Sequence, residues 1–335
     1  MRIVFACTGE GFGHVARTVA LTSVLKHRYE VEVFCPRHLH DFVRAHVPDI
    51  PVHPIPYFAF AKRNDRIHYV RTVKRNLSLI VNFRRHIHKT MRLLRRLAPD
   101  AIVSDYDPFS SYAGRFLGIP VLQINHPSVV LRQPALRPEA LISKAGARFL
   151  MAVYDRLLVC SFYRGEVGPI IRRDLLEAKV SRGDYFVLYL KPSYRRIVTK
   201  KLRRMGIHNY QIFPDPEKDF VKALAGCRAC ISSAGHQFMT EAMVLGKPLF
   251  VIPQKGQYEQ QLNARMLKRS GRGTWSPMRY VERNLRRFIQ ELDSYPKPPA
   301  IIAPRFIIKD DTPRAVRRIE MFVESRSRRK RAAPR

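Results

Sequence analysis

The chain has 335 residues, enough for two domains of ordinary size that each bury a core. Hydrophobic residues make up 46% and charged residues 26%, a composition that excludes an intrinsically disordered chain. The formal net charge of +34 is unusual, because such a charge attracts polyanions: nucleic acid, an anionic membrane face or an anionic substrate.

Two further features narrow the class of protein. No apolar stretch reaches the ~18 residues of a spanning helix, and the start of the chain does not have the pattern of a signal peptide. Five cysteines without a secretory signal favour a reducing cytoplasm. Cys227 and Cys230 form a CxxC, but no second pair completes a zinc site, so we predict structural cysteines.

Short, β-rich apolar runs predict strands, taken in chain order, at residues 2–6, 31–35, 101–104, 121–124 and 156–160. After about residue 160 the pattern restarts, with strands predicted at residues 185–190, 210–213, 229–232 and 249–252. Two successive βαβ series predict an α/β protein with two doubly wound, Rossmann-like domains that face a cleft.

The same pattern suggests how the chain is divided. We place an acceptor-side domain at 1–160, a second Rossmann-like domain at 161–312, a last helix at 313–325 and a basic disordered tail at 326–335. Residues 296–304 form a proline-rich connection within the second domain.

Residues 62–97 carry twelve Lys or Arg and one Asp. Apolar residues recur at helical spacing, at Val70, Val73, Leu77, Ile80, Ile87, Met91 and Leu94. The pattern predicts a long amphipathic helix, or a kinked pair, with a cationic face. A solvated face is the simpler interpretation, whereas charge of one sign at this density favours a surface for anionic lipid head groups.

The segment "TGEGFGH" (8–14) follows the first strand and opens a helix. Its glycines, Gly11 and Gly13, let a ligand approach the backbone closely. The spacing is not that of a dinucleotide fingerprint, and the second strand ends in Cys35 rather than an acid, which disfavours an oxidoreductase. His14 lies in the first helical turn, where the dipole favours the neutral ring, so it is a candidate general base; simple packing is the alternative.

Asp105 and Asp107 directly follow the strand at 101–104. A D-x-D tripeptide can hold a divalent metal, but it is common, and orienting His14 at the same sheet edge is a simpler role for one carboxylate. Asp105 is slightly favoured over Asp107. His126, shortly after the strand at 121–124, is assigned to the acceptor side of this edge.

In the second half, "SSAGHQFMTEA" (232–242) runs from a strand into a helix that begins at Gly235. Free N–H groups at a helix start can bind a diphosphate. Glu241 lies six residues further, about 9 Å along the axis at ~1.5 Å per residue, which matches the separation of a β-phosphate from the ribose hydroxyls. A buried or solvated glutamate without a ligand is the alternative.

The next helix start, in "QKGQYEQQLNA" (254–264), carries Glu259 and Gln260 at the same sheet edge. Side chains of these types form paired hydrogen bonds with sugar hydroxyls. The two segments would therefore contact phosphate, ribose and hexose in succession.

Two motifs resemble those of GT-B glycosyltransferases, most closely the MurG-like group of cell-envelope nucleotide-sugar transferases. They are "GEGFGHVAR" (9–17) and the donor motif "SSAGHQFMTEAMVLGKPLFVIPQKGQYEQQLNA" (232–264). The resemblance implies a donor diphosphate at Ser233, Gly235 and Gln237, a ribose at Glu241, and a hexose at Glu259 and Gln260. His236 is also expected among the donor-binding residues. It implies that His14 is the acceptor's general base and that Gly11 and Gly13 line the acceptor side.

The chain departs from the family at the turn after strand 185–190. That turn reads "YLKPSYR" and lacks the family's glycine, so Lys191 or Ser193 is expected to substitute at the donor phosphate. Glu259 stands where some relatives carry Gln or Asp, which leaves the sugar open.

The resemblance implies transfer of a hexose, from a UDP-sugar, to a lipid or lipid-linked acceptor. With His14 as base, oriented by Asp105, and with the helix start at Gly235 stabilising the leaving diphosphate, we expect no metal requirement and inversion of the anomeric centre. No cofactor beyond the nucleotide-sugar co-substrate is expected. The basic segment 62–97 would hold the enzyme peripherally on the cytoplasmic face of the plasma membrane, and apolar residues near 56–63 would receive the acceptor.

Two alternatives remain. A sugar-nucleotide 2-epimerase or hydrolase would bind the same donor on the same fold without a lipid acceptor. A nucleic-acid-binding protein would explain the charge, but there is no recognisable RNA or DNA module and only one Trp for stacking, so we expect no specific nucleic-acid partner.

Overall fold

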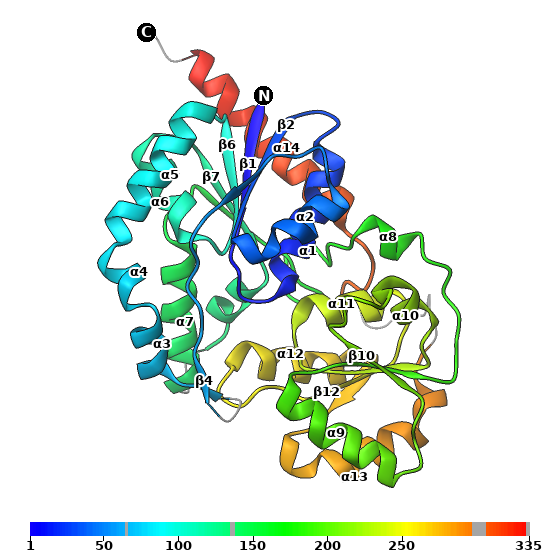
Figure 1. Ribbon diagram of the computed structural model, residues 1–335. Coiled ribbons are helices and arrows are strands. Elements are labelled where there is room, and N and C mark those ends of the chain that lie inside the picture. The colour runs from blue at the N-terminus through cyan, green and yellow to red at the C-terminus, as the bar shows by residue number, and fades with distance from the viewer. Residues whose placement is uncertain (64–65, 135–137, 297–305, 333–335) are drawn as a thin grey trace. The chain divides into compact units, whose positions relative to one another are not determined.

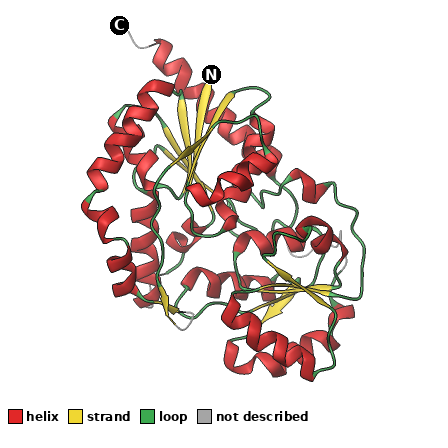
Figure 2. Ribbon diagram, in the orientation of Figure 1, coloured by secondary structure: helices red, strands yellow, loops and turns green. Residues whose placement is uncertain are grey.

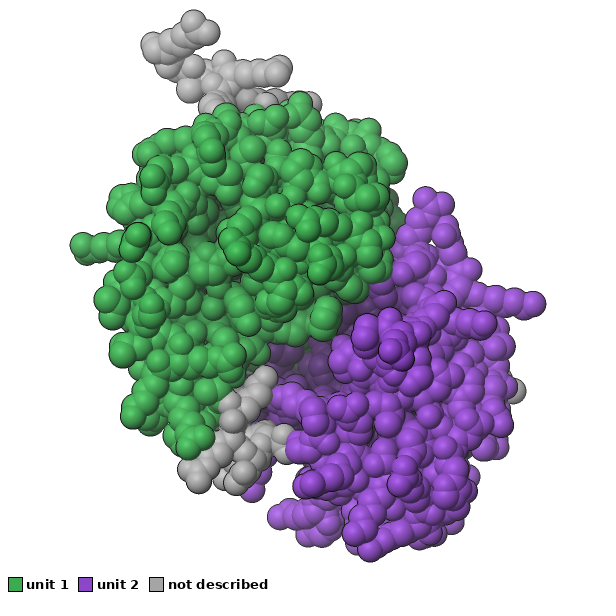
Figure 3. All heavy atoms as spheres, viewed as in Figure 1, with its two compact units in different colours: residues 1–63, 67–170, 310–335 green, residues 64–66, 171–309 purple. Residues whose placement is uncertain are grey.

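The computed structural model describes residues 1–63, 66–134, 138–296 and 306–332 (Figure 1). The chain forms two compact units, coloured separately in Figure 3. Unit 1 contains residues 1–63, 67–170 and 310–335, and unit 2 contains residues 64–66 and 171–309. The change of unit thus falls after residue 170, whereas the sequence pattern suggested a boundary after 160.

Unit 1 contains a parallel sheet with the strand order β3-β2-β1-β6-β7-β8. Its strands are β1 (Arg2–Cys7), β2 (Glu30–Cys35), β3 (Val52–Pro54), β6 (Ala101–Asp105), β7 (Val121–Asn125) and β8 (Arg156–Val159). β1, β6 and β7 are buried along nearly their whole length, which explains why they are almost continuously apolar. In the β1–β6 register Cys7 lies opposite Asp105, so the chain leaves β1 at the same edge at which β6 ends.

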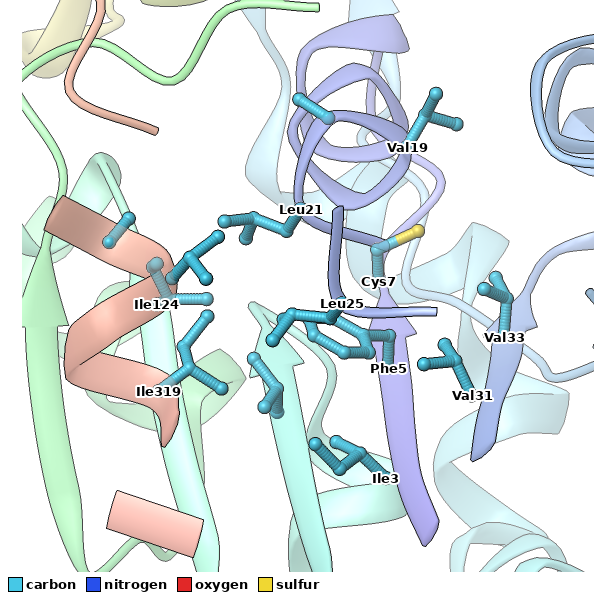
Figure 4. Close-up of a cluster of buried hydrophobic side chains, with 14 of the residues drawn as sticks. Ile3, Phe5, Cys7, Val19, Leu21, Leu25, Val31, Val33, Ile124 and Ile319 are labelled. Carbon is cyan, nitrogen blue, oxygen red and sulfur yellow. The ribbon is translucent and has the colours of Figure 1, made fainter. Parts of the chain in front are cut away.

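Helices cover both faces of this sheet (Figure 2). They are α1 (Phe12–Leu25), α2 (His40–His46), α3 (Tyr69–Arg75), α4 (Leu77–Val81), α5 (Phe83–Leu97), α6 (Pro108–Phe116), α7 (Pro138–Met151) and α14 (Thr312–Ala332), with 3-10 turns η1 (Arg37–Leu39) and η2 (Pro127–Arg132). On one face, Figure 4 shows Phe5 and Ile3 of β1 converging with Leu25 of α1 and Ile319 of α14. Burial of this apolar surface holds α14 on unit 1 although its sequence follows unit 2.

The α14 helix is longer than the sequence pattern predicted. It runs to Ala332, so the first seven residues of the expected disordered tail, 326–332, are helical. The segment is rich in Arg, Lys and Ala, which are strong helix formers. The last three residues of the chain lie outside the described part.

The basic segment 62–97 is not one helix or a kinked pair. It contains the two-residue strands β4 (Lys62–Arg63) and β5 (Arg66–Ile67), and then α3, α4 and α5 in succession. The break between α3 and α4 falls at Asn76, which is buried. Its side-chain amide donates to Ala59 O at 2.8 Å and accepts from Ala59 N at 2.9 Å. The helix is therefore interrupted where Asn76 forms hydrogen bonds with the backbone of Ala59. The spacing of apolar residues within the segment does not predict this interruption.

The predicted apolar row of this segment is only partly buried. Ile87, Met91 and Leu94 of α5 pack into the unit 1 core. The remaining members face solvent on α3 and α4, where Val81 is also exposed: Val70, Val73, Leu77 and Ile80. The α3–α4 surface is therefore both basic and apolar.

Unit 2 contains a parallel sheet with the order β10-β9-β11-β12-β13. Its strands are β9 (Phe186–Tyr189), β10 (Tyr210–Phe213), β11 (Ala229–Ser232), β12 (Leu249–Val251) and β13 (Gly273–Trp275). Its helices are α8 (Arg173–Leu176), α9 (Pro192–Arg204), α10 (Phe220–Gly226), α11 (His236–Val244), α12 (Tyr258–Arg269) and α13 (Val281–Gln290), with η3 (Met278–Tyr280) and η4 (Leu292–Ser294). The proline-rich connection falls almost wholly outside the described residues.

The predicted fold class is confirmed: two parallel sheets, each flanked by helices. In the part of the chain that the structure describes, no helix combines the length and the apolar character needed to cross a membrane.

Candidate functional site

The first candidate site lies where β1 passes into α1. Gly11 is the residue before the helix, with φ 89°, and no described side chain caps this helix start. A Cβ added at Gly11 would meet no described atom within 4 Å. Glycine is therefore favoured here by the positive φ angle and not by a lack of space. Gly13 is the second residue of α1. The Thr8 N–H donates to Asp105 O at 3.1 Å and ties the turn to the end of β6.

His14 lies against Asp105 at this edge. Its Nδ1 is 2.7 Å from Asp105 Oδ1, and the His14 side chain is 12% exposed. With Nδ1–H donating to the carboxylate, Nε2 carries the lone pair and can accept a proton.

Arg17, one helical turn after His14, completes a three-residue network. Its Nε donates to Asp105 Oδ2 at 2.9 Å, and its Nη2 lies 3.1 Å from both Asp105 Oδ1 and His14 Nδ1. Burial opposes ionisation of Asp105, but the Arg17 guanidinium and the His14 ring outweigh it and lower the pKa of this carboxyl. The sequence reasoning did not select Arg17, although it closes the motif "GHVAR".

Asp107 has a different set of partners. Its carboxylate accepts from the N–H groups of Phe109 (3.3 Å) and Ser110 (2.8 Å), and so caps α6. Burial raises the pKa of Asp107 to about 6, against the opposing effect of these hydrogen bonds. The two carboxylates of the D-x-D tripeptide therefore serve separate networks, and Asp105 is the one beside His14.

His126 lies at the end of β7 and is buried. Its Nδ1 is 3.2 Å from Cys160 O, and its ring meets the edge of the Tyr163 ring at a centroid distance of 5.7 Å. His126 is thus buried at the edge at which β7 ends, and its place on the acceptor side stays a prediction.

The second candidate site lies in unit 2, where β11 passes into α11. Gly235 precedes the helix with φ −74° and ψ 129°, and no described side chain caps this start. A Cβ at Gly235 would meet no described atom within 4 Å. Ser233 N donates to Tyr189 O at 3.3 Å, and Gly235 N donates to Ser233 O at 2.8 Å. The turn therefore leads into a nine-residue helix with His236 and Gln237 in its first turn.

Glu241 is buried one turn further along α11. Its Oε1 accepts from Gln237 Nε2 at 3.0 Å, so two predicted donor residues contact one another. Burial and then the charge of Glu241 raise the pKa of Tyr189 to about 12, which places this tyrosine in the same environment. Tyr189 also stacks on Phe238, with centroids 4.8 Å apart. Sequence reasoning missed Tyr189, although it ends a strand at this edge.

Lys191 and Ser193 follow the end of β9, which pairs with β11. Lys191 is the residue before α9, and Ser193 is in its first turn. Both positions therefore lie at the carboxyl edge that also carries Ser233 and Gly235.

The start of α12 is tied to the same turn. The Nδ2 of buried Asn263 donates to Ala234 O at 3.1 Å and lies 3.4 Å from Glu259 Oε1. Gln260 Oε1 accepts from Gln254 N at 3.0 Å. The amide oxygen of Gln260 is thus engaged within the loop, and Glu259 lies next to Asn263, which contacts the Gly235 turn.

The CxxC cysteines are buried free thiols, with the two Sγ atoms 3.6 Å apart. Among the residues that the structure describes, no group of three His, Cys, Asp or Glu side chains is arranged to hold a metal ion.

Comparison with known proteins identifies the family. A family model described as "Glycosyl transferase family 1" matches residues 1–293. An uncharacterised glycosyltransferase of Methanosarcina acetivorans is 23% identical over 328 residues, covering 82% of this chain and 85% of the relative.

Solved structures share the fold. Glycosyltransferase SsfS6 of Streptomyces sp. SF2575, complexed with thymidine diphosphate, is 17% identical, covers 96% of this chain and 99% of its own, and has a TM-score of 0.59. MurG of Acinetobacter baumannii is 15% identical with the same coverage and a TM-score of 0.57. The resemblance drawn from the two motifs is confirmed, and the chain belongs to glycosyl transferase family 1 as a glycosyltransferase of the GT-B fold.

Proposed function

We propose that this glycosyltransferase moves a hexose from a nucleoside-diphosphate sugar, a UDP-sugar in the first instance, to a hydroxyl group of a lipid or lipid-linked acceptor. The observation that carries the proposal is the 2.7 Å contact between His14 and Asp105 beside an open glycine turn. In a glycosyltransferase, a buried carboxylate behind a partly exposed imidazole is the arrangement expected of a general base.

In the proposed step, Nε2 of His14 takes the proton of the acceptor hydroxyl. The acceptor oxygen then forms a bond to the anomeric carbon while the bond from that carbon to the diphosphate oxygen breaks. The electron pair leaves with the diphosphate, and attack opposite the leaving group inverts the anomeric centre. Asp105 orients His14, and its negative charge stabilises the protonated ring that results.

Donor binding is assigned to the α11 start. Its N–H groups and dipole favour a diphosphate, and Glu241 has the acceptor oxygens that ribose hydroxyls require. The complex of SsfS6 with thymidine diphosphate supports a nucleotide ligand for this fold. Lys191, together with Ser193 and Ser233, would balance the charge that develops on the leaving group. The proposal requires no metal and no cofactor.

The lipid character of the acceptor is supported by unit 1. Glu10, in the glycine turn, accepts from Phe60 N at 2.6 Å, so the apolar segment 56–61 lies beside the turn that leads to His14. The neighbouring α3 and α4 expose five apolar side chains among basic ones. A surface of this kind suits the interface of an anionic membrane, where apolar groups insert and cations remain with the head groups.

The reaction is tested by incubating the enzyme with UDP-hexoses, alone and with polyprenyl-phosphate-linked or glycolipid acceptors. A new glycolipid product that requires both substrates supports transfer. Formation of an epimer or free sugar at full rate from the donor alone would instead support the epimerase or hydrolase reading.

The ribose assignment is tested by titrating UDP and 2′,3′-dideoxy-UDP into the wild type and Glu241→Gln. Loss of hydrogen bonds to a charged group should weaken UDP binding by about tenfold or more and leave dideoxy-UDP little changed. An equal loss of affinity for both ligands would show that Glu241 does not contact the ribose hydroxyls.

A further inference from the structure

We infer that unit 2 carries a second anionic-lipid docking surface, formed by the outer faces of α9 and of the η3–α13 segment. None of its residues belongs to the two candidate sites or to the α3–α5 region. The surface is defined by eight exposed cations: Arg196, Lys200, Arg203, Arg204, Arg279, Arg283, Arg286 and Arg287.

The two helices face outward with the same pattern. On α9 the cations occupy positions i, i+4, i+7 and i+8 from Arg196, and on η3–α13 they occupy the same positions from Arg279. The opposite rows, which include Val198 and Leu202 on α9 and Leu285 on α13, are buried together in the unit 2 core. Packing on the sheet therefore fixes both cationic rows toward solvent.

The two helices are neighbours, and in Figure 1 α9 and α13 lie side by side. Lys201 of α9 donates to Glu282 of α13 at 2.6 Å. Glu282 is the one acidic residue in 192–204 and 278–290, against ten Lys or Arg. Glu291, just after α13, pairs with Arg287. The two rows are therefore predominantly cationic, and Glu282 and Glu291 are the acidic residues that contact them.

Such a face is not explained by folding or by solubility. Cations at i and i+4 of an α-helix repel one another and weaken it, and this spacing occurs three times within α9 and α13. A surface of mixed charge would keep the protein in solution equally well. A bound layer of anions would relieve the repulsion, so the charge pattern fits a polyanionic partner.

The chemistry points to phosphate groups in a planar array. Seven of the eight cations are Arg, whose planar fork matches phosphate oxygens. On α9 the side chains of Arg196, Thr199, Lys200, Arg203 and Arg204 line a shallow, open depression of the surface. An anionic phospholipid bilayer presents such an array.

A nucleic-acid strand fits less well. Single-stranded binding uses aromatic rings on which bases stack. In the described residues of these two segments the exposed aromatic ring is Tyr280, and the guanidiniums of Arg279 and Arg283 lie 4.7 and 5.3 Å from its centre. The ring is thus already occupied by cation–π contacts.

This face differs from the α3–α4 surface in the way it would bind a membrane. Apart from Tyr280 it exposes one large apolar side chain, Ile197 at 39%, so it would bind by charge rather than by insertion. Its contribution to membrane binding should therefore disappear at high salt.

The test measures partitioning of the full chain onto vesicles of phosphatidylcholine with 30% phosphatidylglycerol. The α9 variant is Arg196→Gln/Lys200→Gln/Arg204→Gln, and a second, independent variant is Arg279→Gln/Arg283→Gln/Arg286→Gln. The matched control, Lys222→Gln/Arg265→Gln/Lys268→Gln, removes three exposed cations from α10 and α12 of the same unit. Thermal unfolding verifies that each variant is folded.

Each surface variant should bind these vesicles about a hundredfold more weakly than the control, because each basic residue near an anionic surface is worth about a factor of five. The difference should vanish in 1 M salt and on pure phosphatidylcholine. The inference is overturned if both surface variants bind like the control, or if they lose binding to a single-stranded RNA oligonucleotide but not to vesicles. The assay contains no sugar donor, so its outcome is independent of the proposed transfer reaction.

Discussion

The two candidate sites are built from different kinds of groups: side chains in unit 1, and mainly a helix start in unit 2. In unit 1, His14 and Arg17 of α1 form a closed network with the Asp105 carboxylate of β6. In unit 2, the notable features are a bare helix start, a small residue in front of it and one buried carboxylate. The contrast teaches that the first site should be sensitive to charge and the second to size.

The largest effect is expected for His14→Gln. Loss of a general base typically lowers turnover by about 10²- to 10⁴-fold, and kcat should fall by this amount with donor saturating. Nucleotide binding, which we assign to unit 2, should be unchanged by calorimetry. His208→Gln, an exposed histidine of unit 2, is the matched control. Turnover close to wild type in His14→Gln would remove the base assignment.

The next effect is expected for Asp105→Asn. This change leaves the buried Arg17 cation without its carboxylate, a loss of about 3–5 kcal/mol in the free energy of unfolding. Because the pKa of Asp105 is lowered in the folded state, its stabilising contribution is present above its unfolded pKa of about 4 and is lost as pH falls further. Urea denaturation should therefore show a deficit at pH 7 that shrinks in acid. An equal deficit at all pH values would contradict the charge network.

Asp107→Asn should have the opposite pH signature. The folded pKa of about 6 lies above the unfolded value of about 4, so the folded state binds more protons between them and wild-type stability falls as pH rises through this range. Asn keeps the α6 cap without the buried charge. The variant should gain up to about 3 kcal/mol relative to wild type between pH 4 and 6, with little change in turnover. A variant that loses stability across this range would show that the carboxylate is needed as a charge.

The smallest effect is expected for Gly235→Ala. Its backbone angles suit any L-residue and its Cβ would meet open space, so stability should be unchanged. A methyl group at the helix start should weaken UDP binding by about tenfold, the equivalent of one hydrogen bond to a charged group. In the control Gly273→Ala, the Cβ would lie 2.2 Å from Leu249 O, so that variant should lose stability instead. Unchanged UDP affinity in Gly235→Ala would place the diphosphate elsewhere.

The sequence predicted the architecture well because buried parallel strands are apolar along their whole length. All nine predicted strands are present. The edge strands β3 and β13 were missed, since each has three residues, the first ends in proline and the second begins with glycine, residues that weaken a strand signal.

The sites were predictable to the extent that they are local. Gly235, Gln237 and Glu241 belong to one turn and helix, so spacing alone brings them together. Arg17 was not predictable in its role, because its partner Asp105 is 88 positions away. The interruption at Asn76 likewise depends on Ala59, which no periodicity within the helix reveals.

The Asn76 contact has a mechanical consequence. Asn76 joins α3 and α4 to the backbone of Ala59, and the adjacent Phe60 is held by Glu10 of the glycine turn. Two hydrogen-bonded links and one peptide bond thus separate the exposed helices from the glycine turn, which leads directly into α1 and the proposed base His14. A force that tilts these helices as they enter a lipid layer would be transmitted to that turn. Adsorption to the membrane and catalysis would therefore be mechanically coupled.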